Sequence, residues 1–169
     1  EWNEYREIMM IHRITDVNDP KYIYHIEEII TLIRELRVIS YENNVKSGFI
    51  WASWDDELAM TNAEIREQLE EGLIENTSEL QIVIISGKVI GLVNLHYGGD
   101  TMTIGLLCVA SMCRGLGVGD KLMENILSVA KESSCQQVVV STETTNKPAM
   151  SLYQKFGLVP FTVELGLRL

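Results

Sequence analysis

The sequence predicts an α/β fold of the α+β type, with a mixed, mostly antiparallel central sheet flanked by about four helices. Two observations lead to this class. Between residues 80 and 109, three consecutive β-branched runs are separated by short glycine turns, as in an antiparallel meander. On either side of the meander, apolar residues recur every three or four positions, which is the spacing of helices that cover a sheet.

The first part of the chain is predicted to contain one strand and two helices. Ile8–Ile14 is typical of a strand, and apolar residues spaced from Tyr22 to Leu36 predict a helix. Residues 40–56 lose this periodicity and are expected to form a loop. Thr61–Glu64 matches a capping box, which opens a second helix that ends before Asn76.

The middle of the chain is predicted to form the sheet. Leu80–Ile85 and Val89–His96 form a hairpin, and Thr101–Val109 is the next strand. An amphipathic helix follows Gly119, and Val138–Val140 is then a buried strand. A strand–helix–strand connection of this length is most simply parallel and right-handed.

The last predicted elements are a helix and a strand. The helix opens at Asn146 and is closed by Gly157, a residue type that favours a left-handed helix end. Strict alternation over residues 161–169 predicts one final strand. Its apolar face either completes the sheet within one subunit or is shared between two, so a homodimer is one expectation.

Composition limits the class of protein. The 169 residues, 46% of them hydrophobic, suit a single domain over residues 1–169, with residues 1–7 expected to be a disordered leader. No apolar run reaches the about 18 residues of a membrane span, and the chain does not open with a signal-peptide pattern. We therefore expect a cytoplasmic protein with no membrane partner.

Charge and cysteine usage exclude further classes. A formal net charge of −10 disfavours nucleic acid as a partner and favours a cationic or amine substrate, although acidity that only maintains solubility explains it equally well. The three cysteines and three histidines show no short ligand spacing. This pattern predicts no metal site and no disulfide framework, and it suits a reducing compartment.

The glycine-rich stretch at the end of the meander is the expected anion site. Gly115, Gly117 and Gly119 alternate just before the next helix, so the backbone can turn sharply and direct several N–H groups at one point. The helix start adds positive potential. The spacing is not the GxGxxG of a dinucleotide fold, and the GK[ST] ending of a P-loop is missing.

Two segments resemble the GCN5-related N-acetyltransferase (GNAT) family. Arg114–Gly119, RGLGVG, matches that family's (Q/R)xxGx(G/A) motif, and Val109 stands where its VxPxxR lead-in begins. Asn146–Leu158, NKPAMSLYQKFGL, is similar to the family segment NxxAxxLYxKxGF. The resemblance covers residues 8–158 and implies a GNAT-like acyl-CoA N-acyltransferase fold.

The resemblance implies acetyl-CoA as the cofactor and no metal. The pyrophosphate is implied to lie on the N–H groups of residues 114–119, and the pantetheine between strands 101–109 and 137–141, which splay apart. The alternative for Asn146 is a plain helix cap. The residues implied to bind the cofactor are Leu107, Cys108, Val109, Arg114, Gly115, Leu116, Gly117, Val118, Gly119, Asn146 and Tyr153.

The catalytic residues are less fully implied. By resemblance, the Tyr153 phenol protonates the departing CoA thiolate, and such general acid catalysis contributes ~10²–10⁴-fold; the alternative is an aromatic that only packs inside. Many family members carry a glutamate before the turn, where this chain has Gly105 and Leu106. Glu143, His96 or a water chain are the remaining candidates for the base.

The sequence therefore predicts an N-acetyltransferase in which a neutral primary amine attacks the acetyl thioester directly in a ternary complex. The acceptor stays open: an amino sugar, a polyamine or other small amine, or a peptide. The alternative is a non-catalytic module with the same fold that binds or senses acyl-CoA, suggested by the missing carboxylate. Ser111 stands in place of the family's proline, which should loosen the turn slightly.

Overall fold

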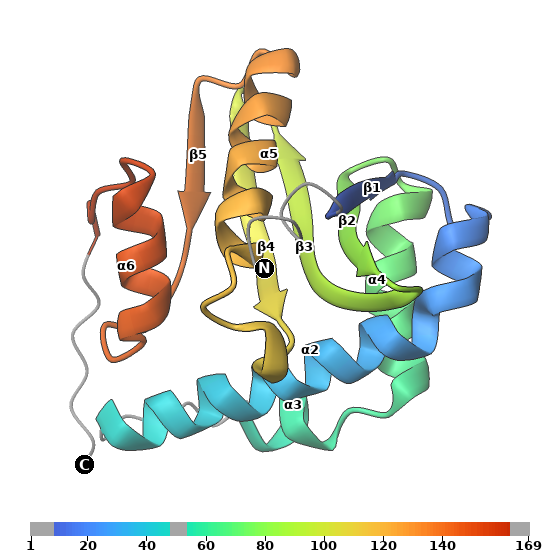
Figure 1. Cartoon of the computed structure of the whole chain (residues 1–169), viewed down its shortest axis with the longest axis horizontal. Helices are drawn as coiled ribbons and strands as arrows, with labels where there is room; N and C mark the ends of the chain where they lie inside the picture. Colours follow the sequence, from blue (N-terminus) through green and yellow to red (C-terminus); the bar gives the residue numbers. More distant parts are fainter. Residues whose placement is uncertain (1–8, 48–53, 163–169) are drawn as a thin grey trace.

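A five-stranded sheet forms the centre of the molecule, in the order β1-β2-β3-β4-β5 (Figure 1). The computed structural model describes residues 9–47 and 54–162. The first three pairings are antiparallel and β4–β5 is parallel, which confirms the predicted mixed, mostly antiparallel sheet. The strands are β1 (Met10–Ile14), β2 (Ser78–Ile85), β3 (Lys88–Gly98), β4 (Thr101–Val109) and β5 (Gln137–Val140).

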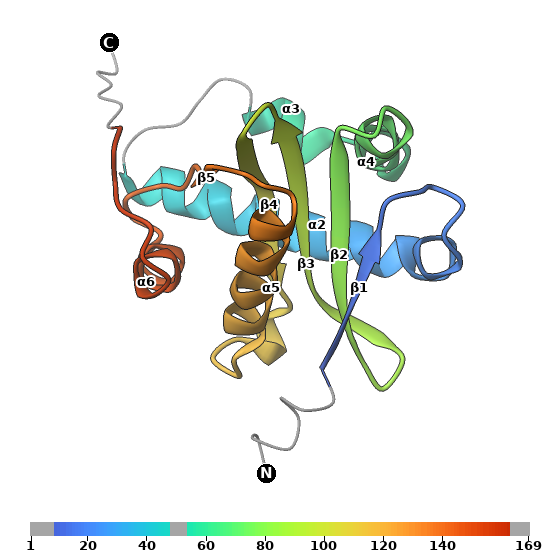
Figure 2. The same ribbon diagram turned by 90° about the horizontal axis from the view of Figure 1, so that it is seen from above.

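Helices cover both faces of this sheet, with α4 and α5 on opposite sides (Figure 2). One buried apolar cluster joins the sheet to α2 and α4, and a second joins it to α5 and α6. Within the described residues, no helix carries an apolar stretch that could cross a membrane. The helices are α2 (Pro20–Ser47), α3 (Trp54–Ala59), α4 (Asn62–Ile74), α5 (Val118–Glu132) and α6 (Lys147–Lys155).

The predicted loop over residues 40–56 is wrong at both of its described ends. Helix α2 continues to Ser47, and α3 begins at Trp54. The cause is tertiary packing, because Asn44 is buried at 5% exposure against the loop that follows β5. Such packing outweighs the weak helix propensity of the Glu-Asn-Asn stretch at 42–44. The capping box of Thr61 and Glu64 is confirmed.

The predicted final strand falls mostly outside the described residues, which end at 162. Phe161 and Thr162, its first two residues, are in no strand, and Phe161 is 77% exposed. The expected leader over residues 1–7 also lies outside the described part of the chain.

The β4–β5 pairing is short, and its end is where the site begins. Parallel pairing runs from Thr101 with Gln137 to Ile104 with Val140 and stops there. Strand β4 continues to Val109 beside β3 alone, whereas the chain after β5 leads to α6 (Figure 1). The register of β3 and β4 shifts at Asn94 and Leu95, which leaves Gly105 as an extra residue on β4.

Candidate functional site

The loop between β4 and α5 is a compact turn that depends on two left-handed glycines. Its first residues form a short 3₁₀ helix, η1 (Ser111–Cys113). Gly115 then has φ +74° and Gly117 has φ +83°, a backbone region that other residues enter only at a cost. The loop can therefore reverse direction within four residues and begin α5 at Val118.

The N-terminus of α5 is left without a side-chain cap. Thr61 caps α4 and Asn146 caps α6, but Gly117 has no side chain with which to cap α5. The first N–H groups of a helix have no acceptor within the helix, and they lie at its positive end. An anion bound here would supply the missing acceptor. The Asp120 carboxylate in the first turn of α5 does not cancel this positive potential, because Lys155 Nζ lies 2.7 Å from its Oδ1.

Two close approaches fix where the start of α5 lies. A Cβ built on Gly91 of β3 would come 2.8 Å from Val118 Cγ1, and one built on Gly119 would come 3.1 Å from Leu152 Cδ2. Glycine at these positions lets β3 and α6 pack directly on the first turn of α5. Gly119 therefore serves packing, whereas Gly115 and Gly117 are the glycines of this stretch with positive φ.

The predicted pantetheine-binding strand carries Leu107, Cys108 and Val109 on β4, next to the point where β5 departs. Cys108 points away from that edge: its Sγ donates to Leu32 O of α2 at 3.1 Å. Burial raises the pKa of the Cys108 thiol to about 12. The thiol is therefore protonated near neutral pH and is a poor nucleophile.

Tyr153 of α6 has a buried ring and an unused hydroxyl. The residue is 8% exposed, and its hydroxyl has no hydrogen-bond partner among the described residues. Burial, with a further contribution from the Glu143 carboxylate, raises the pKa of the Tyr153 phenol to about 12. The phenol thus keeps its proton at neutral pH and has it available for a group outside the protein.

The loop after β5 holds Glu143 against the end of α2. Asn44 Nδ2 donates to Glu143 Oε1 at 3.0 Å, and Thr145 Oγ1 donates to Asn43 O at 3.0 Å. In the same loop, Asn146 Oδ1 accepts from Ala149 N at 3.3 Å. Asn146 therefore caps α6 in this structure, which confirms the predicted helix cap.

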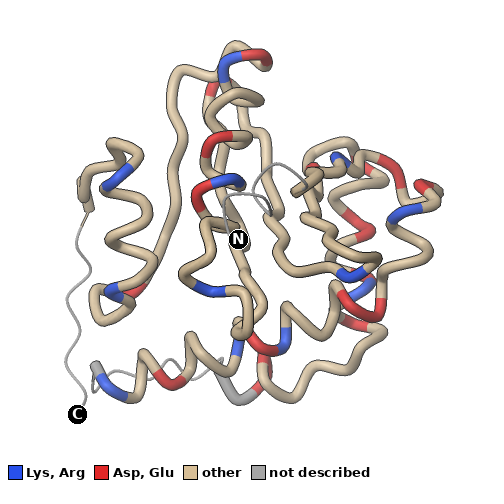
Figure 3. The backbone as a smooth tube through the Cα atoms, in the orientation of Figure 1, with Lys and Arg blue, Asp and Glu red and all other residues tan. Residues whose placement is uncertain are grey.

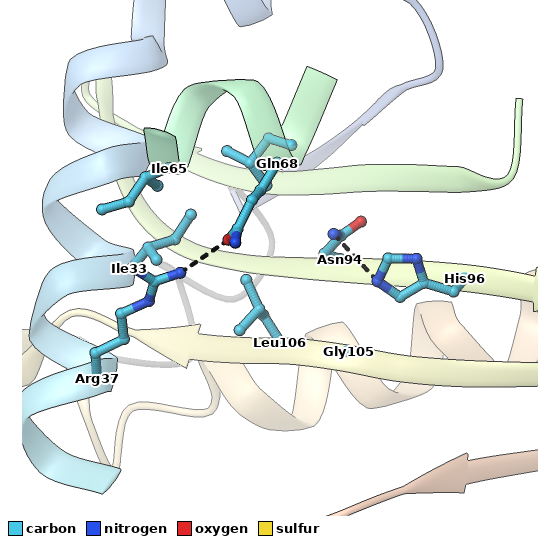
Figure 4. A pocket seen from close by; sticks show the side chains of 9 residues that line it. Ile33, Arg37, Ile65, Gln68, Asn94, His96, Gly105 and Leu106 are labelled. Atoms are coloured by element: carbon cyan, nitrogen blue, oxygen red, sulfur yellow. Dashed lines mark hydrogen bonds between the residues drawn. The ribbon is translucent and has the colours of Figure 1, made fainter. Parts of the chain in front are cut away.

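His96 lies elsewhere, in a pocket of about 240 Å³ between the sheet and helices α2 and α4 (Figure 4). A Cβ on Gly105 would come 2.6 Å from His96 Nε2, so the imidazole covers the first β4 residue beyond the β4–β5 pairing. Among described residues, no hydrogen bond or ion pair joins His96 to Tyr153 or Glu143. The structure thus places the Glu143 carboxylate near Tyr153, and His96 in the pocket that α2 and α4 line.

The pocket includes residues that the sequence reasoning missed. Arg37 Nη2 of α2 donates to Gln68 Oε1 of α4 at 3.1 Å (Figure 4), and Asn94 Nδ2 lies 3.4 Å from His96 Nε2. Ile33 and Arg37 are four residues apart on one helix, a spacing that could have indicated a shared face. The pairing of α2 with α4 had no signal in the sequence.

Acidic residues are spread along several helices and are not gathered at the turn before α5 (Figure 3). Arg114 is the single charged residue between Val109 and Val118. Two acidic side chains from outside this stretch, Glu35 and Asp120, lie close to it, and each forms an ion pair, with Arg114 and Lys155 respectively. Among the described residues, no three or more His, Cys, Asp and Glu side chains are grouped closely enough to hold a metal ion.

Comparison with known proteins shows to which family this chain belongs. A sequence model of the acetyltransferase (GNAT) family matches residues 33–158. The chain belongs to the acetyltransferase (GNAT) family. The GNAT match covers α2 from Ile33 onward and every later element from α3 to α6, including the glycine turn.

Curated GNAT relatives match part of the chain. N-alpha-acetyltransferase 30 of Schizosaccharomyces pombe is 35% identical over 72 residues, which are 42% of this chain and 48% of that protein. N-alpha-acetyltransferase MAK3 of Arabidopsis thaliana is 30% identical over 77 residues, 43% of this chain and 40% of that protein. The matched segments thus span less than half the length of these relatives.

Solved structures show the same fold over almost the whole chain. A mutant of the BH1408 protein from Bacillus halodurans has a TM-score of 0.73 at 19% identity and covers 95% of this chain and 99% of that one. The AAC(6')-Iy structure, in complex with the bisubstrate analog CoA-S-monomethyl-acetylneamine, has a TM-score of 0.66 at 15% identity and covers 95% and 97%. At such identities the likeness concerns the fold.

Proposed function

We propose that this GNAT chain is an acetyl-CoA-dependent N-acetyltransferase that acetylates a primary amine by direct attack in a ternary complex. One observation carries the proposal: the uncapped start of α5 and Tyr153, whose hydroxyl has no hydrogen-bond partner among the described residues, belong to the same buried cluster, against which Leu107 and Val109 of β4 pack. The first feature suits a diphosphate and the second suits a leaving group that needs a proton.

The residues present fit acetyl-CoA. The N–H groups of the turn and of the first turn of α5, over residues 114–119, would hold the pyrophosphate, and Leu107–Val109 would border the pantetheine. The AAC(6')-Iy complex with a CoA-containing analog supports this assignment by likeness of fold. When bound, acetyl-CoA would supply an acetyl group activated as a thioester.

Tyr153 acts in this proposal as a proton donor, and Glu143 keeps that proton in place. A carboxylate near a phenol disfavours the phenolate, so Glu143 adds to the effect of burial on the Tyr153 hydroxyl. The Glu143 carboxylate already accepts from Asn44. That arrangement favours an electrostatic role for Glu143 over the role of base.

His96 is the proposed proton acceptor for the amine. Its imidazole lines the pocket and covers Gly105, where β4 becomes free of β5. An amine that enters through the pocket would therefore pass the imidazole before it reaches the β4 edge. Imidazole is the side chain best suited to take up a proton near neutral pH.

The acceptor is proposed to be a small amine or a peptide. Relatives named N-alpha-acetyltransferase favour a peptide α-amine, and the structural neighbour meta-AAC0020, an aminoglycoside acetyltransferase, favours an amino sugar. Among the described residues, Arg37 lines the pocket and no carboxylate does, which argues against a polyamine at that point. We further propose a single domain that works in the cytoplasm, consistent with its three free cysteines.

Thiol release from acetyl-CoA, measured over a panel of peptides, amino sugars and polyamines, tests this proposal. Calorimetric titration with CoA is run in parallel. CoA binding together with amine-dependent thiol release supports the enzyme. Tight CoA binding without release for any amine would instead favour an acyl-CoA sensor, and the lack of a carboxylate at Gly105 and Leu106 is the observation that keeps this alternative.

A further inference from the structure

Glu35 of α2 is bound to the glycine turn, although it is distant from it in sequence. Its Oε1 accepts from the backbone N–H of Ser111 at 3.0 Å and from Arg114 Nη2 at 3.0 Å. Arg114 Nε in turn donates to Val109 O at 3.1 Å. One carboxylate oxygen thus ties both ends of the segment 111–114 to a helix that packs on the sheet.

We propose that Glu35 is a positioning residue for the diphosphate-binding turn. Its two contacts hold the 3₁₀ helix η1 and Arg114, so the backbone just downstream, at Gly115–Gly117, starts from a fixed place. The proposal rests on the proposed function, since it assumes that the turn receives the diphosphate of CoA.

The direction of the Arg114 side chain supports this role. The guanidinium is occupied by Glu35 and Val109 O, so it braces the turn from within. The ion pair also cancels the charge of Glu35, which alone would repel a diphosphate nearby. The diphosphate would then be held by backbone N–H groups and the helix start, with Arg114 keeping those groups in position.

Helix α2 also contacts strand β4, so its position relative to the sheet is fixed close to Glu35. Three residues before Glu35, Leu32 O accepts the Cys108 thiol of β4 at 3.1 Å, and Leu32 is 5% exposed. Two residues three positions apart on one helix therefore hold the last part of β4 and the turn that follows it. A shift of the turn relative to β4 would break one contact or the other.

The contacts of Glu35 should affect CoA binding more than they affect the stability of the fold. The side chains of Arg114 and Glu35 are 46% and 29% exposed, and pairs this exposed add little to the free energy of unfolding. Loss of the Glu35 contacts should thus leave the fold intact. What it should change is the fraction of molecules whose turn is ready for the diphosphate, and hence the affinity for CoA.

Ser111 offers a rescue that a merely structural role would not predict. Ala110 has φ −50° and ψ +135°, the conformation favoured before proline, and Ser111 is the first residue of a short helix, where proline is well accepted. Proline at position 111 would lack the N–H that Glu35 binds, but its ring would restrict the backbone of the turn directly. The Ser111→Pro substitution should therefore have its largest effect on CoA binding when Glu35 is absent.

Calorimetric titration with CoA, which involves no turnover, tests the proposal on Glu35→Ala, Glu35→Gln and the double variant Glu35→Ala/Ser111→Pro. Glu42→Ala is the matched control, because Glu42 is exposed on the same helix. We expect Glu35→Ala to weaken CoA binding about tenfold, Glu35→Gln to weaken it less, and the double variant to recover most of the loss. The melting temperatures should agree with that of Glu42→Ala.

Steady-state kinetics give a second readout. The KM for acetyl-CoA should rise in Glu35→Ala, while kcat and the KM for the amine stay close to those of Glu42→Ala. The positioning role would be overturned if Glu35→Ala bound CoA as tightly as Glu42→Ala, or more tightly. Tighter binding would mean that Arg114, released from Glu35, binds the diphosphate itself. Failure of the unmodified chain to bind CoA would overturn the proposed function first, and this inference with it.

Discussion

The Glu143 carboxylate and the burial of the ring act in the same direction on Tyr153, with burial the larger effect, and together they raise the pKa of its phenol to about 12. The hydroxyl is protonated at neutral pH, and the ring belongs to the buried cluster against which Leu107 and Val109 of β4 pack. A neutral phenol is in the protonation state that a proton donor requires.

Replacing Tyr153 with Phe tests this role directly. We expect kcat to fall by about 10²-fold or more, since a general acid typically contributes that much, while the Kd for CoA stays the same. Steady-state kinetics and calorimetry measure the two quantities. An enzyme that retains full kcat after this change would show that Tyr153 only packs.

The same pKa shift predicts how stability depends on pH. The phenol ionises near its ordinary pKa of 10.0 in the unfolded chain and at about 12 in the folded one. Its contribution to the free energy of unfolding is therefore complete below pH 10 and is lost as the pH rises toward 12. Urea unfolding between pH 9 and pH 12 should show this fall. The slope of the free energy of unfolding against pH should be steeper than in Tyr153→Phe, by an amount that corresponds to about one bound proton.

Gly105→Ala should impair turnover through His96. The new Cβ would come 2.6 Å from His96 Nε2, so the imidazole must turn away, which costs little because it is the end of a side chain. We expect a loss of kcat similar to that of His96→Gln, with the CoA affinity and melting temperature little changed. Gly98→Ala is the control, because a Cβ there meets nothing within 4 Å. Equal activity of the Gly105 and Gly98 variants would argue against His96 as base.

Gly91→Ala should act on the start of α5. Its Cβ would come 2.8 Å from Val118 Cγ1 and 3.4 Å from Cys108 O, so the first turn of α5 must move. Overpacking of this kind costs about 1–3 kcal/mol. We expect weaker CoA binding as well, and partial recovery of both properties in Gly91→Ala/Val118→Ala. Full additivity of the two substitutions would contradict the contact.

Local patterns sufficed for most of the fold. The hairpin, the capping box of Thr61 and the closure of α6 at Gly157, which has φ +87°, depend on residues close in sequence, and all three are found. The true length of α2 was not predictable in this way. Its last turns are held by Glu143 and Thr145, which lie about a hundred positions further along the chain.

In the candidate site, too, residues in local motifs were predictable from the sequence and residues brought in by tertiary packing were not. The turn over residues 114–119 and Tyr153 belong to continuous motifs, and their places were readable from the sequence. Glu35, Arg37 and Gln68 reach the site only because α2 and α4 pack on the sheet. Such contacts between distant segments leave no periodic signal in a single sequence.

The length of α2 has one further consequence. At 28 residues the helix extends about 42 Å, and along this axis it meets the pocket at Ile33 and Arg37, the turn at Glu35, and the Glu143 loop at Asn44. The positions are related by a fixed rotation of about 100° per residue. One alanine inserted between Arg37 and Asn43 would therefore put the two halves of the site out of phase without removing a single one of their side chains.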